Sequence, residues 1–344
     1  MAKKKDQEKV ELDIVDSVLS GIKKEYGEIF HSAEDIINED RNIISIGPKI
    51  DAMLNGGLLE GTIATMTGKQ GSGKTTTALT AAVDAQKKGK VIYYISIEGR
   101  IERKNLEGVE GLNLDPKKFV IIQSSEEKIL TGNDFLQITL NILNQHKGCF
   151  VIVDSISAIS DNKEYAGGVN AETRGSGNKL ASTFIRQAAQ SIRANKCTLI
   201  LIGHLQMKQG TVSYWDEKIA DQVKYFTSLQ LRIRKYEDWK IGSGENEEQI
   251  GQKVHWEVEK NPLGPPGRST VSYIRYGVGV DKIAEYVSLG EDYGFIEKSG
   301  SWYVIDFLPD KPKCQGEASL HKHFRENPKD FEELKKQVDS INSK

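Results

Sequence analysis

The sequence predicts an α/β fold in which helices cover both faces of a mostly parallel central sheet. Five runs are continuously apolar, as strands buried on both faces are, and helical stretches separate them. Three later runs alternate apolar and polar residues and have short connections, which is typical of an antiparallel extension at one sheet edge. After Gly279 a helix–hairpin pattern and a polar helical tail predict a small α+β domain.

The N-terminal segment is expected to contain one amphipathic helix. Residues 1–9 are polar and are expected to form a mobile arm. Two alternatives remain for the helix that follows: it packs on its own domain, or it docks on a neighbouring copy of the chain. Residues 10–31 carry apolar side chains near helical spacing, at Val10, Leu12, Val15, Val18, Leu19, Ile22 and Tyr26.

The central sheet is expected to take its strands from eight places. The segment NPLGPPG (261–267) is typical of a stiff turn between the last two of them. We expect three parts along the chain, residues 1–45, 46–280 and 281–344. The predicted strands are TIATMT (62–67), KVIYYISI (90–97), FVIIQS (119–124), CFVIVD (149–154), CTLILIG (197–203), SLQLRIR (228–234), KVHWEVE (253–259) and STVSYIR (269–275).

The composition excludes several classes of protein. The 344 residues are 38% hydrophobic, enough for one large core and a smaller domain, and the formal net charge is −2. This balance argues against a protein that coats DNA by bulk charge, although local basic loops remain compatible with it. No apolar run is long enough for a membrane helix, and no apolar stretch follows the basic N-terminus as in a secretory signal. We expect a soluble, cytoplasmic protein with no membrane partner.

Three cysteines, Cys149, Cys197 and Cys314, lie far apart in the sequence without a CxxC pair. A sparse and odd set is typical of a reducing compartment and predicts no disulfide framework. Cys149 and Cys197 each open an apolar, strand-like run, so we expect both side chains to lie in the core.

The strongest local signal is GKQGSGKT, which fits the pattern G-x-x-x-x-G-K-[ST] between an apolar strand and a helix-forming run. Glycines let backbone N–H groups turn toward phosphate oxygens, and the helix N-terminus adds positive potential. Lys74 can reach the outer phosphates, and Thr75 can ligate Mg²⁺. The alternative, a glycine-rich turn that binds nothing, is disfavoured by the strand–loop–helix context. The residues expected to bind the nucleotide here are Gly68, Gly71, Ser72, Gly73, Lys74, Thr75 and Thr76.

Three further polar residues follow apolar runs. Asp154, with Ser155 beside it, ends CFVIVD and can orient the Mg²⁺ water shell; a helix N-cap is the alternative. Glu98 follows VIYYISI and can hold or activate an attacking water, or else it is a surface or capping residue. His204 follows CTLILIG and could hydrogen-bond a terminal phosphate, although a single histidine at a strand end is usually structural.

The order and spacing of Lys74, Glu98, Asp154 and His204 at the ends of buried strands resemble the bacterial RecA family. The resemblance covers almost the whole chain, and its final stretch looks like the small C-terminal domain of the bacterial type. The segments that carry it are GIKKEYG, IISIGPKIDAMLNGGLLEGTIATMTG, the P-loop, FVIVDSISAI, EVEKNPLGPPG and GVDKIAEYVSLGEDYGFIEKSGSWY.

The resemblance implies a role for each matching position. Glu98 would activate water for ATP hydrolysis, and Asp154, beside Ser155, would serve the Mg²⁺ site together with Thr75. Lys74 would act on the phosphates. Lys260 matches one of two lysines that reach across a filament to the neighbour's ATP.

Several positions depart from the family pattern. His204 stands where the family has a γ-phosphate-sensing glutamine, and Pro262 stands where it has a second trans lysine. The adenine-stacking tyrosine is missing, and Asn105 lies near its place. Ile219 and Ala220 replace a glycine pair. These departures suggest a divergent member, for which a phage or plasmid gene is a conjectured source.

The resemblance also implies two DNA-binding loops, at about 160–179 and 205–222. The first is polar and glycine-rich, a composition that also suits a mere linker, although it is long for one. The second joins large apolar groups to cations, which suits unstacked bases; a hairpin with its aromatic side chains in the core is the alternative. The expected DNA contacts are Lys163, Arg174, Lys179 and Arg186 for the first loop, and Met207, Lys208, Tyr214 and Trp215 for the second.

The resemblance therefore implies a DNA-dependent ATPase that uses ATP and Mg²⁺. It would polymerise as a helical filament on single-stranded DNA and exchange strands with a homologous duplex. The alternatives are a ring-forming DNA motor, a non-catalytic DNA-binding mediator that keeps the fold, and a nucleotide-regulated signalling ATPase that does not bind DNA.

Overall fold

The structure of the protein, a computed structural model, describes residues 2–27, 29, 31, 33–39, 41–160, 176–208, 214–242 and 247–342. The chain forms two compact units, Met1–Arg41 and Asn42–Lys344. Among the helices that are described, none combines the length and the apolar character that crossing a bilayer requires.

The first unit contains the helices α1 (Ala2–Tyr26) and α2 (Ala33–Ile37). The helix α1 begins at Ala2, so the predicted start of the helix at residue 10 is wrong, while the predicted mobility of residues 1–9 stays a prediction. The opening segment AKKKDQEK consists mostly of Ala, Lys, Gln and Glu, which are strong helix formers and need no apolar periodicity to be helical.

The helix α1 ends at Tyr26, earlier than the predicted residue 31. Gly27 adopts the left-handed conformation, with φ of 82°, and its N–H donates to the Lys23 carbonyl at 2.9 Å. Val15 and Val18 are more than half exposed. The apolar stripe that the sequence predicts is thus present on the helix and faces solvent in this unit.

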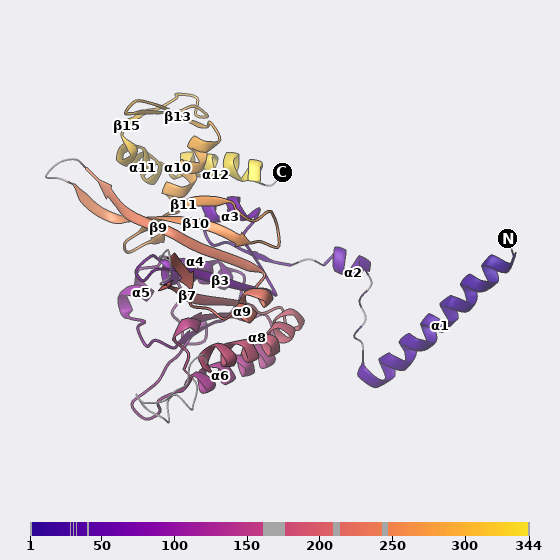
Figure 1. Cartoon of the computed structure of the whole chain (residues 1–344). Coiled ribbons are helices and arrows are strands. Elements are labelled where there is room, and N and C mark those ends of the chain that lie inside the picture. Colours follow the sequence, from indigo (N-terminus) through magenta and orange to yellow (C-terminus); the bar gives the residue numbers. More distant parts are fainter. Residues whose placement is uncertain are drawn as a thin grey trace. The chain divides into compact units, whose positions relative to one another are not determined.

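Among the described residues of the second unit, ten strands form a central sheet (Figure 1). The strands are β3 (Ile63–Gly68), β4 (Ile92–Ser96), β5 (Phe119–Ile122), β6 (Phe150–Asp154), β7 (Thr198–Lys208), β8 (Tyr214–Glu217), β9 (Leu229–Ile241), β10 (Glu248–Lys260), β11 (Ser269–Arg275) and β12 (Gly279–Val280). Their order is β12-β11-β10-β9-β3-β7-β6-β4-β5, with β8 paired to β7 outside this path. The pairs from β9 to β5 are parallel, which confirms the predicted sheet.

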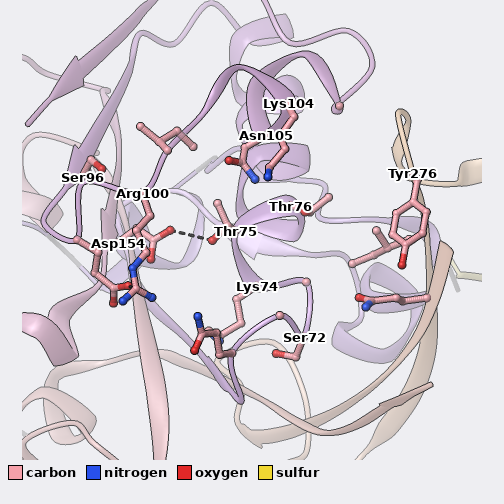
Figure 2. Close-up of a pocket in the computed structure, with 18 of the residues that line it drawn as sticks. Ser72, Lys74, Thr75, Thr76, Ser96, Arg100, Lys104, Asn105, Asp154 and Tyr276 are labelled. Carbon is pink, nitrogen blue, oxygen red and sulfur yellow. Dashed lines mark hydrogen bonds and ion pairs between the residues drawn. The ribbon is translucent and has the colours of Figure 1, made fainter. Parts of the chain in front are cut away.

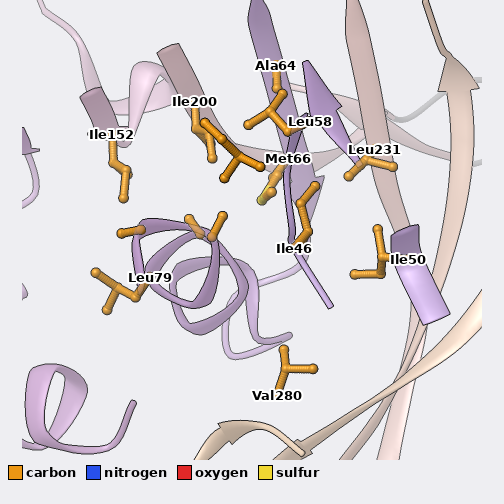
Figure 3. Packing of buried hydrophobic residues seen from close by; sticks show 14 of the residues in the cluster. Ile46, Ile50, Leu58, Ala64, Met66, Leu79, Ile152, Ile200, Leu231 and Val280 are labelled. Atoms are coloured by element: carbon orange, nitrogen blue, oxygen red, sulfur yellow. The ribbon is translucent and has the colours of Figure 1, made fainter. Parts of the chain in front are cut away.

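Helices cover both faces of this sheet, as predicted. On one face α4 (Lys74–Lys87) packs on a cluster that includes Ile152 (Figure 3). The side chain of the adjacent Val151 points the other way, into the cluster under α6 (Gly132–Gln145) and α8 (Ser176–Ala194). The shorter elements are β1 (Ile43–Ile44), β2 (Leu58–Leu59), α3 (Pro48–Leu54), α5 (Arg103–Glu107), the 3-10 helix η1 (Ile156–Ala158) and α9 (Asp221–Phe226).

The antiparallel edge of the sheet is more extended than the sequence predicts. The strands β9 and β10 have 13 residues each, and their hairpin projects beyond the rest of the sheet (Figure 1). The outer part of β9 is mostly exposed and polar, so it lacks the apolar alternation that marks the inner part. Cross-strand ion pairs bridge the two strands instead, between Arg234 and Glu257 and, near the tip, between Lys240 and Glu247 at 2.8 Å.

The predicted α+β region after residue 280 is confirmed. It holds a three-stranded antiparallel sheet in the order β13-β14-β15, and its own apolar cluster includes Leu289, Phe324 and Leu334. The domain boundary that we predict near residue 280 stays a prediction. The elements are α10 (Lys282–Asp292), β13 (Ile296–Ser299), β14 (Trp302–Ile305), β15 (Lys313–Gln315), α11 (Glu317–Glu326) and α12 (Pro328–Asn342).

Two buried carboxyl groups lie where α3 and α10 meet. Glu285 on α10 accepts hydrogen bonds from the backbone N–H of Lys49, at 2.9 Å, and from the hydroxyl of Ser272. Asp51 on α3 accepts one from the Ser45 hydroxyl at 2.5 Å. Burial raises the pKa of Asp51 to about 7 and the pKa of Glu285 to about 7, although these hydrogen bonds oppose the increase.

The cysteines are free, and Cys149 and Cys197 are fully buried, which confirms their predicted place in the core. They precede the adjacent strands β6 and β7, and their sulfur atoms lie 3.4 Å apart.

Candidate functional site

The phosphate-binding loop connects β3 to α4, as the motif requires. Gly71 and Gly73 adopt positive φ angles of 72° and 91°. A Cβ atom on Gly73 would lie 2.3 Å from Cδ1 of Ile274, so a larger residue does not fit there. The first residues of α4 line a cavity, where the helix N-terminus favours an anion.

Lys74 lies in the first turn of α4, and its Nζ donates to the main-chain carbonyls of Gly68, at 2.9 Å, and Lys69, at 2.7 Å. Burial lowers the pKa of Lys74 to about 8, and the negative charges of Asp154 and Glu98 partly oppose this decrease. A phosphate group would supply both an acceptor and a counter-charge. The ammonium group of Lys74 is therefore suited to give up its hydrogen bonds to the two carbonyls and to bind an anion instead.

The cavity beside the loop, called the P-loop cavity below, has a volume of about 590 Å³. Parallel pairing brings strand ends to its edge: Gly68 is in register with His204, and Ser96 with Asp154. Of the predicted nucleotide-site residues, Gly68, Ser155 and Lys260 do not line it. The lining residues are Gln70, Gly71, Ser72, Gly73, Lys74, Thr75, Thr76, Tyr94, Ser96, Glu98, Arg100, Ile101, Lys104, Asn105, Gly108, Asp154, His204, Gln252, Ile274, Arg275, Tyr276 and Gly277.

Asp154 contacts the phosphate loop directly. The Thr75 hydroxyl donates to Asp154 Oδ2 at 2.8 Å (Figure 2), and the Tyr94 hydroxyl donates to the same oxygen at 2.5 Å. The alternative of a helix N-cap is not observed, because Ser155 occupies that position before η1. The side chain of Asp154 thus belongs to the cavity.

The pair of Thr75 and Asp154 fits a Mg²⁺ ion, because hydroxyl and carboxylate oxygens are the ligands that this ion accepts. Within the described ranges, no group of three or more His, Cys, Asp and Glu side chains could hold a metal alone. Mg²⁺ commonly completes its shell with water and substrate phosphates. These two residues would therefore bind the ion together with a nucleotide.

Glu98 follows β4 and has both carboxylate oxygens engaged. Oε1 accepts a hydrogen bond from the Ser155 hydroxyl at 2.5 Å and lies 2.6 Å from His204 Nε2, while Oε2 lies 3.2 Å from Arg100 Nη1. Burial opposes ionisation of Glu98, but the hydrogen bonds from Ser155 and His204 and the charge of Arg100 outweigh it and lower its pKa. The carboxylate is thus ionised and fixed in place.

The second predicted DNA loop, residues 205–222, contains a β-hairpin in which β7 extends beyond the sheet and pairs with β8. Met207 on β7 is half exposed, and Lys208 forms an ion pair with Asp216. The side chain of Tyr214 lies outside the described residues, as does the hairpin tip.

Trp215 on β8 is partly exposed, so the alternative that places it in the core is wrong. Its ring lies over Lys69 of the phosphate loop, with Nζ 4.4 Å from the ring centroid. A second contact joins β8 to the end of β3, just before the phosphate loop, where the Thr67 hydroxyl donates to Glu217 Oε1 at 2.5 Å. The hairpin is thus attached directly to the phosphate loop.

Two of the remaining predicted DNA contacts, Lys179 and Arg186, do not line the P-loop cavity. Lys179 and Arg186 are exposed on α8, while Lys163 and Arg174 lie outside the described residues. Lys260 ends β10, and its Nζ donates to a backbone carbonyl of α9 at 3.1 Å.

Sequence reasoning missed several residues in and around this site, among them Tyr276, Arg100 and Lys69. Tyr276 follows β11 and forms a cavity wall opposite Asp154 (Figure 2). The sequence feature that could have indicated it is the aromatic–glycine turn YGVG at 276–279. Arg100 lies two residues after Glu98, in the same loop, and could have been found by that proximity. The stacking of Lys69 on Trp215 had no signal in the sequence.

Comparison with known proteins agrees with this geometry. The sequence matches the family described as RecA N-terminal domain over residues 13–281 and the family described as RecA C-terminal domain over residues 284–341. Proteins named RecA from Brucella canis, Brucella abortus and Brucella melitensis are 29% identical over 327 residues, which is 93% of this chain and 86% of each relative. Because the first match covers more than half of the chain and the second most of the remainder, this protein belongs to the RecA family.

Proposed function

We propose that this protein is an ATP-dependent DNA recombinase that assembles as a helical filament on single-stranded DNA and promotes strand exchange. The observation that carries the proposal is the connection between the P-loop cavity and the β7–β8 hairpin. His204 contacts Glu98 at the cavity, and Met207 and Lys208 lie further along the same strand. A single strand can therefore transmit a change at the nucleotide to the hairpin that we propose contacts DNA.

ATP would bind with its phosphates at the loop and the start of α4. Lys74 would leave the carbonyls of Gly68 and Lys69 for the outer phosphates. Tyr276 and Asn105 line the part of the P-loop cavity away from Asp154, where an aromatic face and an amide suit a nucleobase (Figure 2). Thr75 and Asp154 would hold Mg²⁺, which when bound neutralises charge that develops on the phosphates.

Glu98 is the proton acceptor in the proposed hydrolysis. The Ser155 and His204 contacts fix its carboxylate at the end of β4 and keep it ionised. A water held by this carboxylate would lie near the outer phosphate, as an in-line attack requires. His204 would move with Glu98 when the terminal phosphate is lost and would carry that change into β7.

DNA contacts are proposed for the β7–β8 hairpin and for α8. Met207 and Trp215 offer exposed apolar groups on which unstacked bases can pack. Lys179 and Arg186 offer exposed cations for phosphates. Lys208 is already paired with Asp216, so its contribution to DNA affinity is smaller than the sequence alone suggests.

Self-assembly is proposed to use the exposed apolar stripe of α1, which includes Val15 and Val18. Burying such a stripe against another copy stabilises an assembly in proportion to the apolar area covered. Lys260, which does not line the P-loop cavity of its own chain, would contribute a cation to the neighbour's nucleotide.

A strand-exchange assay tests this function. The protein, circular single-stranded DNA and a homologous linear duplex are incubated with ATP and Mg²⁺, and joint molecules are separated on a gel. The proposal predicts joint molecules with the homologous duplex, none with a heterologous one, and none for Lys74→Ala. Tight DNA binding without any joint molecules would favour a non-catalytic mediator and contradict the proposal.

A further inference from the structure

Arg100 is a cation at the reacting end of the P-loop cavity. It lies beside Asp154 in Figure 2, on the side of the phosphate loop opposite Tyr276. Its Nη1 is 3.2 Å from Oε2 of Glu98, yet 66% of its side chain is exposed. A guanidinium that is so exposed can leave its partner at little cost, because surface ion pairs contribute little to stability.

The other cations of the P-loop cavity have different positions. Lys74 donates to a carbonyl of the phosphate loop, Lys104 pairs with Glu102 at 3.1 Å, and Arg275 pairs with Asp281 at 3.5 Å. Arg100 is paired with the carboxylate that the proposed hydrolysis needs as a base.

We propose that Arg100 is a further catalytic residue, which binds the γ-phosphate of ATP within the same chain. The inference rests on the proposed ATPase function and adds a residue to it. When the triphosphate enters, the guanidinium exchanges Glu98 Oε2 for γ-phosphate oxygens, to which it can donate two parallel hydrogen bonds. With ADP it stays on Glu98.

This exchange frees the base only when its substrate is present. Glu98 Oε1 remains held by Ser155 and His204, while Oε2 becomes available to a water. The water oxygen forms a bond to the γ-phosphorus and gives a proton to Glu98. The bond between that phosphorus and the β–γ bridging oxygen breaks, and its electron pair stays on ADP. Arg100 stabilises the charge on the transferring phosphoryl group.

The test compares Arg100→Ala, Arg100→Lys and the matched control Arg103→Ala. Arg103 lies on the same segment, is highly exposed, pairs with Glu107 at 2.6 Å and does not line the P-loop cavity. Single-turnover hydrolysis of ATP is measured with Mg²⁺ and single-stranded DNA. Affinities for ADP and for ADP with aluminium fluoride, a mimic of the transferring phosphoryl group, are measured by calorimetry.

We expect Arg100→Ala to lower the single-turnover rate by about 10³-fold, the lower end of what an arginine finger contributes. It should keep the affinity for ADP and lose the added affinity for the aluminium fluoride complex. Arg100→Lys should recover part of both, and Arg103→Ala should match the wild type. Wild-type turnover and analogue binding in Arg100→Ala would overturn this inference while leaving the ATPase intact. A wild-type protein that does not hydrolyse ATP would instead overturn the proposed function, and the inference with it.

Discussion

The substitution Glu98→Gln removes the proposed proton acceptor and keeps the shape of the side chain. The amide oxygen can still accept from the Ser155 hydroxyl and face His204, so the two contacts at 2.5 and 2.6 Å have a replacement. What is lost is the ion pair with the exposed Arg100, which contributes at most about 1 kcal/mol to stability. The fold should therefore be almost as stable as in the wild type.

The chemical step should be affected far more than the fold. A positioned general base contributes about 10²–10⁴-fold, which corresponds to about 3–5 kcal/mol of activation free energy. ATP affinity should be equal or higher, because a negative charge near the phosphates is removed. Single-turnover hydrolysis and equilibrium binding of a fluorescent ATP analogue measure the two effects separately. Hydrolysis by Glu98→Gln at the wild-type rate would refute the assignment of the base.

Three further predictions concern charge and contact. The pKa of Lys74 is about 8 and phosphates favour its protonated form, so nucleotide affinity should fall above pH 8, and calorimetry in two buffers should detect proton uptake on binding. Nucleotide binding at the phosphate loop should change the contact between Lys69 and the Trp215 ring and therefore change the tryptophan fluorescence. A fluorescence change that persists in Trp215→Phe would contradict this link. Burial raises the carboxyl pKa of Asp51 and of Glu285 to about 7, so the stability that these two groups contribute should be greatest at acidic pH and should decline as the pH rises from about 4 to about 7, which adds a negative slope to the pH dependence of stability. Glu285→Gln should flatten that slope in urea unfolding, and an unchanged slope would refute the effect.

Much of the central sheet could be predicted because its strands are buried on both faces. Such strands are continuously apolar, and the polar residues that follow their apolar runs, Glu98, Asp154 and His204, stand out as polar breaks, although β7 continues past His204 to Lys208. Parallel pairing then brings those breaks together, so the P-loop cavity follows from the strand order. The phosphate loop could also be predicted from its glycines, because the positive φ angles that the loop requires exclude most other residues.

The features that were missed depend on contacts between distant segments or on helix propensity. Tyr276 reaches the P-loop cavity from a turn about 200 residues after the phosphate loop, and Lys69 meets Trp215 only because β8 folds back on β7. The outer half of the β9–β10 hairpin is mostly exposed, and its few buried apolar side chains, such as Trp239, do not make a regular period-two pattern. The start of α1 has helical propensity without apolar spacing, so periodicity placed its beginning too late.

The recombinase proposal is best tested by measuring ATP hydrolysis with and without long single-stranded DNA and imaging the same samples by negative stain. We predict that DNA strongly stimulates hydrolysis and that the samples contain open helical filaments. Closed rings would favour a ring-forming motor, and filaments without turnover would favour a mediator. Hydrolysis that does not respond to DNA, in samples without filaments, would contradict the proposed recombinase.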